Sequence, residues 1–90
     1  MTPEGKVQAY LKRRVLETGG EFRKLKWDGR RNAPDTLIWW VNDYAYFVEV
    51  KRPGEDATPA QKREHKRLPF PTFVIDNEAG VDTFVDTYRA

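Results

Sequence analysis

Hydrophobic residues recur at helical spacing in the first and last parts of the chain. A helix over about residues 4–18 is predicted by four apolar side chains spaced near one turn apart: Val7, Tyr10, Leu11 and Val15. Gly19 follows, and glycine commonly ends a helix because it adopts the left-handed backbone conformation. The clearest amphipathic helix lies near the C-terminus, with apolar positions i, i+3, i+4 and i+7: Val81, Phe84, Val85 and Tyr88.

Between these segments the pattern changes to the shorter period of β-strands. Residues 21–27 (EFRKLKW) alternate, and residues 36–41 (TLIWWV) form an apolar run typical of a strand buried on both sides. Residues 44–51 (YAYFVEVK) are predicted to return from a turn at 42–43, giving a hairpin. Residues 71–76 (PTFVID) predict a short last strand.

A middle helix is predicted between the hairpin and the last strand. Thr58 can cap the free amides of its first turn, and Pro59 suits the first helical position. The helix should end before Pro69. The complete order is αβββαβα, which predicts one α/β domain over residues 1–90, with a mixed central sheet flanked by helices.

Composition narrows the class of protein. A hydrophobic share of 39% and a charged share of 33% are typical of a globular domain rather than a disordered segment. No apolar run approaches the roughly 18–20 residues that span a bilayer, and the first residues lack a signal-peptide pattern. There is no cysteine, which excludes disulfides and thiolate metal sites. We therefore expect a cytoplasmic protein without a membrane partner.

The charge distribution is more informative than the net charge of +2. Residues 1–75 carry 15 Lys/Arg against 10 Asp/Glu, whereas residues 76–90 carry one Arg against four acids. A basic body with an acidic tail suits a polyanionic ligand that binds away from the C-terminus. Ordinary solvated surface charge fits the same totals.

Two carboxylates and an amine are predicted to meet at one end of the sheet. Side chains alternate along a strand, so Glu49 and Lys51 share one face. Asp35 lies at the start of the preceding strand, and a hairpin that turns near 42–43 places it roughly opposite position 49 or 50. Neighbouring carboxylates repel unless a cation lies between them, and Mg²⁺ prefers oxygen ligands.

This combination suits the hydrolysis of phosphodiester bonds. A bound metal lowers the pKa of a water ligand and polarises a phosphoryl oxygen, while Lys51 could orient the water or stabilise developing charge. The alternative is a structural ion pair at a strand end, which Glu-x-Lys by itself fits well.

Three stretches of the chain resemble a known family. They are EGKVQAYLKRRVLETGGEFRKLKWDGRRNAPD, YFVEVKRPGEDATPAQKREHKRL and FVIDNEAGVDTF, and together they cover nearly the whole sequence. With these motifs the chain resembles a small stand-alone VRR-NUC domain, a branch of the PD-(D/E)xK nucleases found in phages and repair enzymes. The resemblance implies a restriction-endonuclease-like core, dependence on Mg²⁺ or Mn²⁺, and no small-molecule cofactor.

The resemblance also implies roles for individual residues. Asp35 and Glu49 would bind the metal ion, with the backbone carbonyl of Val50 as a further ligand. Lys51 would position or activate the attacking water.

Two further residues match the family's site, and each has a structural alternative. Glu4 would complete the metal site, and its spacing from Val7 and Leu11 predicts an inward position; alternatively, it is a first-turn acid favoured by the helix dipole. Gln61 matches the glutamine on the helix after the catalytic strand. Alternatively, it closes a capping box with Thr58.

Eight basic residues are candidates for contacts with nucleic acid, although a solvated surface is the alternative for most of them. Lys24 matches a lysine of the family pattern, and arginines offer a planar fork of donors to phosphate. His65, the sole histidine, is predicted to pack or cap rather than to bind metal. The candidates are Lys24, Lys26, Arg30, Arg31, Arg52, Lys62, Arg63 and Lys66.

The predicted function is that of an endonuclease on DNA. Stand-alone members of this family resemble Holliday-junction resolvases, which act as dimers, so branched DNA and a homodimer are expected. Trp39 and Trp40 point to opposite faces of one strand, so one of them could support an interface or both could fill the core. The compact form suggests a phage origin, with the host cytoplasm as location. The alternative function is a non-catalytic nucleic-acid-binding module that keeps the fold.

Overall fold

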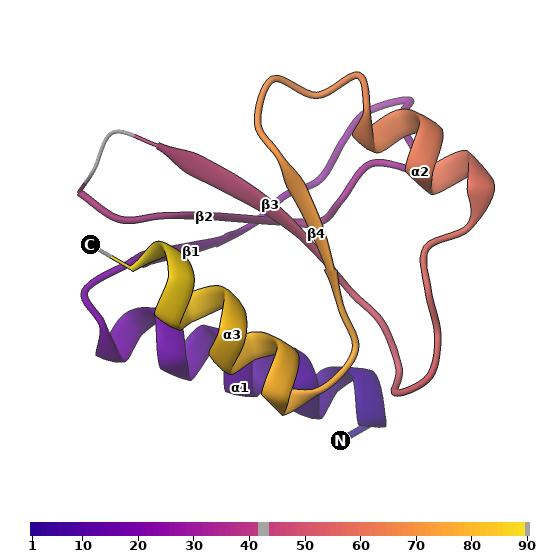
Figure 1. The fold of residues 1–90 in the computed structure, drawn as a ribbon. Helices are drawn as coiled ribbons and strands as arrows, with labels where there is room; N and C mark the ends of the chain where they lie inside the picture. The colour runs from indigo at the N-terminus through magenta and orange to yellow at the C-terminus, as the bar shows by residue number, and fades with distance from the viewer. Residues whose placement is uncertain (42–43, 90) are drawn as a thin grey trace.

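The computed structural model describes residues 1–41 and 44–89, and within them the order of elements is αβββαβα, as predicted (Figure 1). The predicted turn at 42–43 lies outside the described residues. No helix among the described residues has the length and apolar character required to span a membrane. The elements are α1 (Pro3–Glu17), β1 (Glu21–Lys24), β2 (Thr36–Trp39), β3 (Ala45–Val50), α2 (Pro59–His65), β4 (Thr72–Ile75) and α3 (Glu78–Tyr88).

The strands form one mixed sheet in the order β1-β2-β3-β4. The first three strands pair antiparallel, and β3 pairs parallel with β4. In the hairpin, Thr36 lies opposite Val48 and Trp39 lies opposite Ala45. The predicted α/β fold with a mixed sheet is therefore confirmed, and β3 has a neighbouring strand on both sides.

Two helices cover one face of the sheet, because alternation puts the apolar positions of the strands on that side. Helices α1 and α3 lie side by side there, while α2 stands apart from them (Figure 1). Tyr46, Val48 and Val50 of β3 join the core. The remaining buried core residues are Val7, Leu11, Val15, Phe22, Ile38, Trp40, Ile75, Val81, Phe84 and Val85. On the opposite face β3 presents Phe47 and Glu49.

Two elements end three residues earlier than the sequence pattern predicts. Strand β1 ends at Lys24 rather than at Trp27, because Trp27 turns back to pack its ring against Phe47 and donates its indole N–H to the carbonyl of Pro34 (2.6 Å). Helix α2 ends at His65 and continues only as a turn, since the prolines that follow cannot supply helical amide hydrogens. Both differences change the surroundings of the site.

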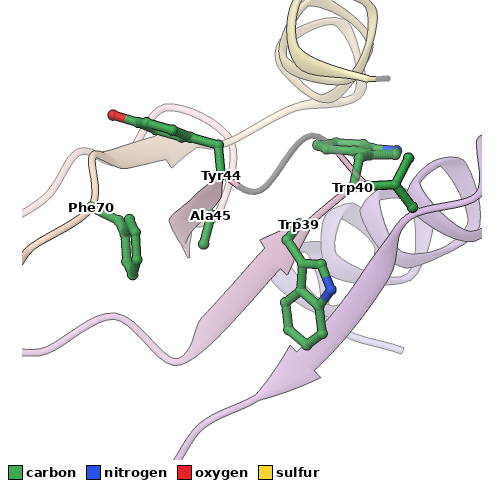
Figure 2. Close-up of a pocket in the computed structure, with 6 residues that line it drawn as sticks. Trp39, Trp40, Tyr44, Ala45 and Phe70 are labelled. Atoms are coloured by element: carbon green, nitrogen blue, oxygen red, sulfur yellow. The ribbon is translucent and has the colours of Figure 1, made fainter.

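The tip of the hairpin carries an open apolar groove (Figure 2). Its volume is about 350 Å³, and Val41 within it is 88% exposed. Trp40 fills the core against Phe84, whereas Trp39 lies outside the core beneath the guanidinium of Arg23. The groove is lined by Trp39, Trp40, Val41, Tyr44, Ala45 and Phe70.

Candidate active site

The structure brings the predicted acids together at one end of the β2–β3 hairpin. Because Thr36 lies opposite Val48, the position before it, Asp35, lies across from Glu49. The charge of Asp35 raises the pKa of Glu49 and the charge of Lys51 lowers it, so both groups lie within electrostatic reach of Glu49. The arrangement predicted from strand alternation is therefore present.

Glu49 carries a carboxyl group in an unfavourable environment. Its side chain is only 12% exposed, and its Oε1 atom has no hydrogen-bond partner among the described residues. Burial, and after it the charge of Asp35, raises the pKa of Glu49 to about 7. Burial and the negative charge of Asp35 both disfavour the ionised form of Glu49, and a bound cation would relieve this condition.

Lys51 and Val50 extend the site along β3. The backbone amide of Lys51 donates to the carbonyl of Ile75 (2.9 Å), which fixes the strand end against β4. Within the described part of the chain, the Lys51 side chain makes no ion pair. The Val50 side chain is buried in the core, so only its backbone can serve the site.

Asp35 forms an ion pair with Lys24, which was predicted to contact DNA. Lys24 Nζ lies 2.6 Å from Asp35 Oδ2 and 3.0 Å from Gln8 Oε1. The Thr36 hydroxyl donates to Asp35 Oδ1 (3.2 Å). Both charged side chains of the pair are nearly half exposed, so the pair contributes little to stability and can be exchanged for another partner of Asp35.

Glu4 and Gln61 are placed differently from each other. Glu4 is exposed, so the predicted inward position is wrong: it lies in the first turn of α1, before the apolar stripe becomes buried at Val7. Its charge nevertheless raises the pKa of Glu49, which puts it on the same side of the molecule.

Gln61 closes the capping box with Thr58. Its side-chain Oε1 accepts from the backbone amide of Thr58 (2.9 Å), and its backbone amide donates to Thr58 Oγ1 (3.1 Å).

Two further residues of α2 lie near the site: Glu64, which the sequence analysis did not single out, and His65, which it predicted to pack or cap rather than to bind metal. His65 Nε2 lies 3.7 Å from Glu49 Oε1, and burial lowers the pKa of this imidazole. Glu64 is buried and accepts two hydrogen bonds from Arg30, at 3.0 and 3.1 Å. The spacing of four residues between Gln61 and His65 was the only available signal, since it places both on one side of the helix.

Some of the candidate DNA-contacting residues form ion pairs with carboxylates, and the others do not. Besides Lys24, three are paired with carboxylates: Arg30 with Glu64, Arg52 with Glu55, and Lys62 with Asp56 (3.0 Å). The other four are exposed and have no acidic partner in residues 1–41 and 44–89. These four are Lys26, Arg31, Arg63 and Lys66.

The acids fit a hydrated divalent cation better than a closed metal cage. Among the described residues, no three His, Asp or Glu side chains are grouped closely enough to hold a metal ion by themselves. Mg²⁺ keeps several waters and often binds through one or two carboxylates together with substrate phosphates. The unpartnered Glu49 oxygen beside Asp35 matches that requirement.

The fold is an α/β domain with a pair of acids at one end of the β2–β3 hairpin, and comparison with known proteins gives the nuclease class and the family. No family model matches the sequence. A protein named "Putative nuclease p44", from Acyrthosiphon pisum secondary endosymbiont phage 1, is 43% identical over 65 residues, which are 72% of this chain and 70% of that protein. A solved structure described as a VRR_NUC domain has 38% identity and a TM-score of 0.88, covering 98% of this chain and 99% of its own. The chain belongs to the VRR_NUC family.

Proposed function

We propose that this protein is a Mg²⁺- or Mn²⁺-dependent endonuclease that hydrolyses phosphodiester bonds in DNA. The observation that carries the proposal is the buried, unpartnered carboxyl of Glu49, whose pKa is raised to about 7 beside Asp35. Family membership and the name of the phage relative support a nuclease.

Each residue of the site has a role in this proposal. Asp35 and Glu49 hold the metal ion, with the backbone carbonyl of Val50 as a further ligand and Glu4 adding negative charge nearby. When bound, the ion supplies an activated water and neutralises charge on the scissile phosphate. Lys51 orients the attacking water or stabilises the charge that develops on the phosphate, because its ammonium is free of acidic partners within the described residues. Gln61 stabilises the first turn of α2, next to the site, through its capping box with Thr58.

In this proposal the substrate is bound by exposed cations that have no acidic partner among the described residues. Lys26, Arg31, Arg63 and Lys66 are exposed, so they can contact phosphates without first breaking an ion pair. Lys24 can move from Asp35 to the DNA when a metal ion takes its place, because their ion pair is exposed. Binding through such contacts weakens steeply with salt.

Incision of a panel of DNA substrates tests the proposal. Purified protein with Mg²⁺ or Mn²⁺ is expected to cut four-way junctions and flaps faster than linear duplex, and a chelator is expected to stop incision, because the acids need the cation to hold the phosphate. Gel analysis of end-labelled strands measures this. Salt-sensitive binding without any cut in either metal would contradict the nuclease and favour a non-catalytic binding module.

We also propose that the protein forms a two-fold homodimer through the groove at the hairpin tip. The groove exposes apolar surface on Val41, Tyr44 and Phe70, which are 88%, 50% and 37% exposed. A second copy would cover this surface, and its site would permit paired incisions in a junction.

Sedimentation tests the dimer. Val41→Glu is expected to shift the protein to a monomer, because it places a charge in the apolar contact without touching the core. Leu16→Glu is the matched control, since Leu16 is also exposed (50%) but lies on α1 outside the groove. A wild-type protein that remains monomeric at high micromolar concentration would contradict the dimer.

A further inference from the structure

His65 faces the site from α2, and the proposed function gives its imidazole no role. Its Nε2 atom and Glu49 Oε1 lie 3.7 Å apart. The two side chains are only 10% and 12% exposed, and both atoms are buried without a hydrogen-bond partner in the described residues. Two polar atoms in this condition are rare in folded proteins, because each loses its bonds to water and gains none in return.

The two atoms are complementary and nearly in contact. A neutral imidazole carries one N–H donor, and a carboxylate oxygen accepts. Hydrogen bonds between nitrogen and oxygen are usually 2.7–3.2 Å long, so a shift of less than about 1 Å would form one. Its formation would satisfy both buried atoms at once.

The rest of α2 holds the imidazole in this position. The capping box of Thr58 and Gln61 fixes the start of the helix. Glu64, the residue before His65, accepts two hydrogen bonds from Arg30 in the loop between β1 and β2. The helix that carries His65 is therefore held both at its start and at the residue next to His65.

We propose that His65 is a positioning residue for the metal site: its Nε2–H donates to Glu49 Oε1 and leaves the other carboxylate oxygen to the ion. The inference rests on the proposed metal-dependent function. Partners of this kind orient metal-binding side chains, and their loss typically weakens metal affinity by about 10–100-fold. His65 touches neither the ion nor the substrate in this arrangement, so its effect passes through Glu49.

Calorimetry with Mn²⁺ in the absence of DNA tests the proposal without relying on activity. His65→Leu keeps the size of the side chain but removes the donor, and it is expected to weaken Mn²⁺ binding by about 10–100-fold. His65→Gln retains an N–H donor at a similar reach and is expected to restore most of the affinity. Arg67→Leu is the matched control, since Arg67 is an exposed residue in the turn that follows α2 and has no role in the site; this variant should bind Mn²⁺ as wild type does.

The outcomes separate this inference from the function on which it rests. Unchanged Mn²⁺ affinity in His65→Leu would overturn the positioning role, and so would equal loss in a folded His65→Gln. Failure of the wild-type protein to bind Mn²⁺ or Mg²⁺ would instead overturn the proposed metal dependence.

NMR of the wild-type protein gives a second readout that needs no variant. Because His65 is the sole histidine, one imidazole spin system carries the whole signal. With Mg²⁺ bound, the proton is expected on Nε2 and its exchange with water is expected to slow, since it lies in a buried hydrogen bond. A proton on Nδ1 instead, or direct coordination through Nε2, would overturn the proposal.

Discussion

Asp35→Asn is expected to lower the rate of DNA incision by roughly 10³-fold or more while the fold remains intact. The amide cannot supply the negative charge that holds a divalent cation beside Glu49. The cost to stability is small, because Asp35 is 47% exposed and its ion pair with Lys24 lies at the surface. We expect the free energy of unfolding to change by less than about 1 kcal/mol.

Single-turnover cleavage of a labelled junction, with excess enzyme and saturating Mn²⁺, measures this loss. Asp86→Asn is the matched control: the substitution is the same, and Asp86 is also an exposed acid in an ion pair, with Arg14 at 2.8 Å, but it lies on α3 outside the site. The control should cut as wild type. Cleavage by Asp35→Asn at a rate close to wild type would contradict the assignment of Asp35 to the metal site.

The face and register of the site residues could be predicted because they follow from local patterning. A slip of one residue would move Val48 and Val50 out of the core, so these two residues fix Glu49 on the other face of β3. The register of the hairpin then places Asp35 across from Glu49.

Other features could not be predicted, because they depend on how distant segments approach each other. No periodicity indicates that Arg30 in a loop reaches Glu64, 34 residues further along the chain. The approach of His65 to Glu49 depends on where α2 lies against the sheet, and α2 contributes few apolar contacts that would mark its position in the sequence. Periodicity also misplaced Glu4, because a helical stripe does not show where the helix leaves the sheet.

Glu49→Gln is expected to stabilise the metal-free protein at pH 8. The pKa of Glu49 is raised from 4.5 to about 7 by burial and by Asp35, so the folded state favours the protonated carboxyl. The stability that this group contributes is fully present below about pH 4.5 and is lost as the pH rises through about 7. Glutamine keeps the shape without the charge, so the variant escapes this loss. We expect a gain of about 1–2 kcal/mol at pH 8, reduced from the full conversion by solvent screening, and a small difference at pH 5.

Urea unfolding in the presence of a chelator at pH 5 and pH 8 measures this gain in the free energy of unfolding. With Mn²⁺ in place of the chelator, we expect wild type to be more stable than Glu49→Gln. A cation that binds only the folded state stabilises it by about 2.7 kcal/mol at a hundred times its dissociation constant. Wild type should gain this and Glu49→Gln should not, since the amide removes a ligand charge. Glu17→Gln, at an exposed acid paired with Arg13 on α1, should follow wild type in both series. Equal stabilisation of Glu49→Gln by Mn²⁺ would show that the cation binds elsewhere, because the proposed site depends on the negative charge of Glu49.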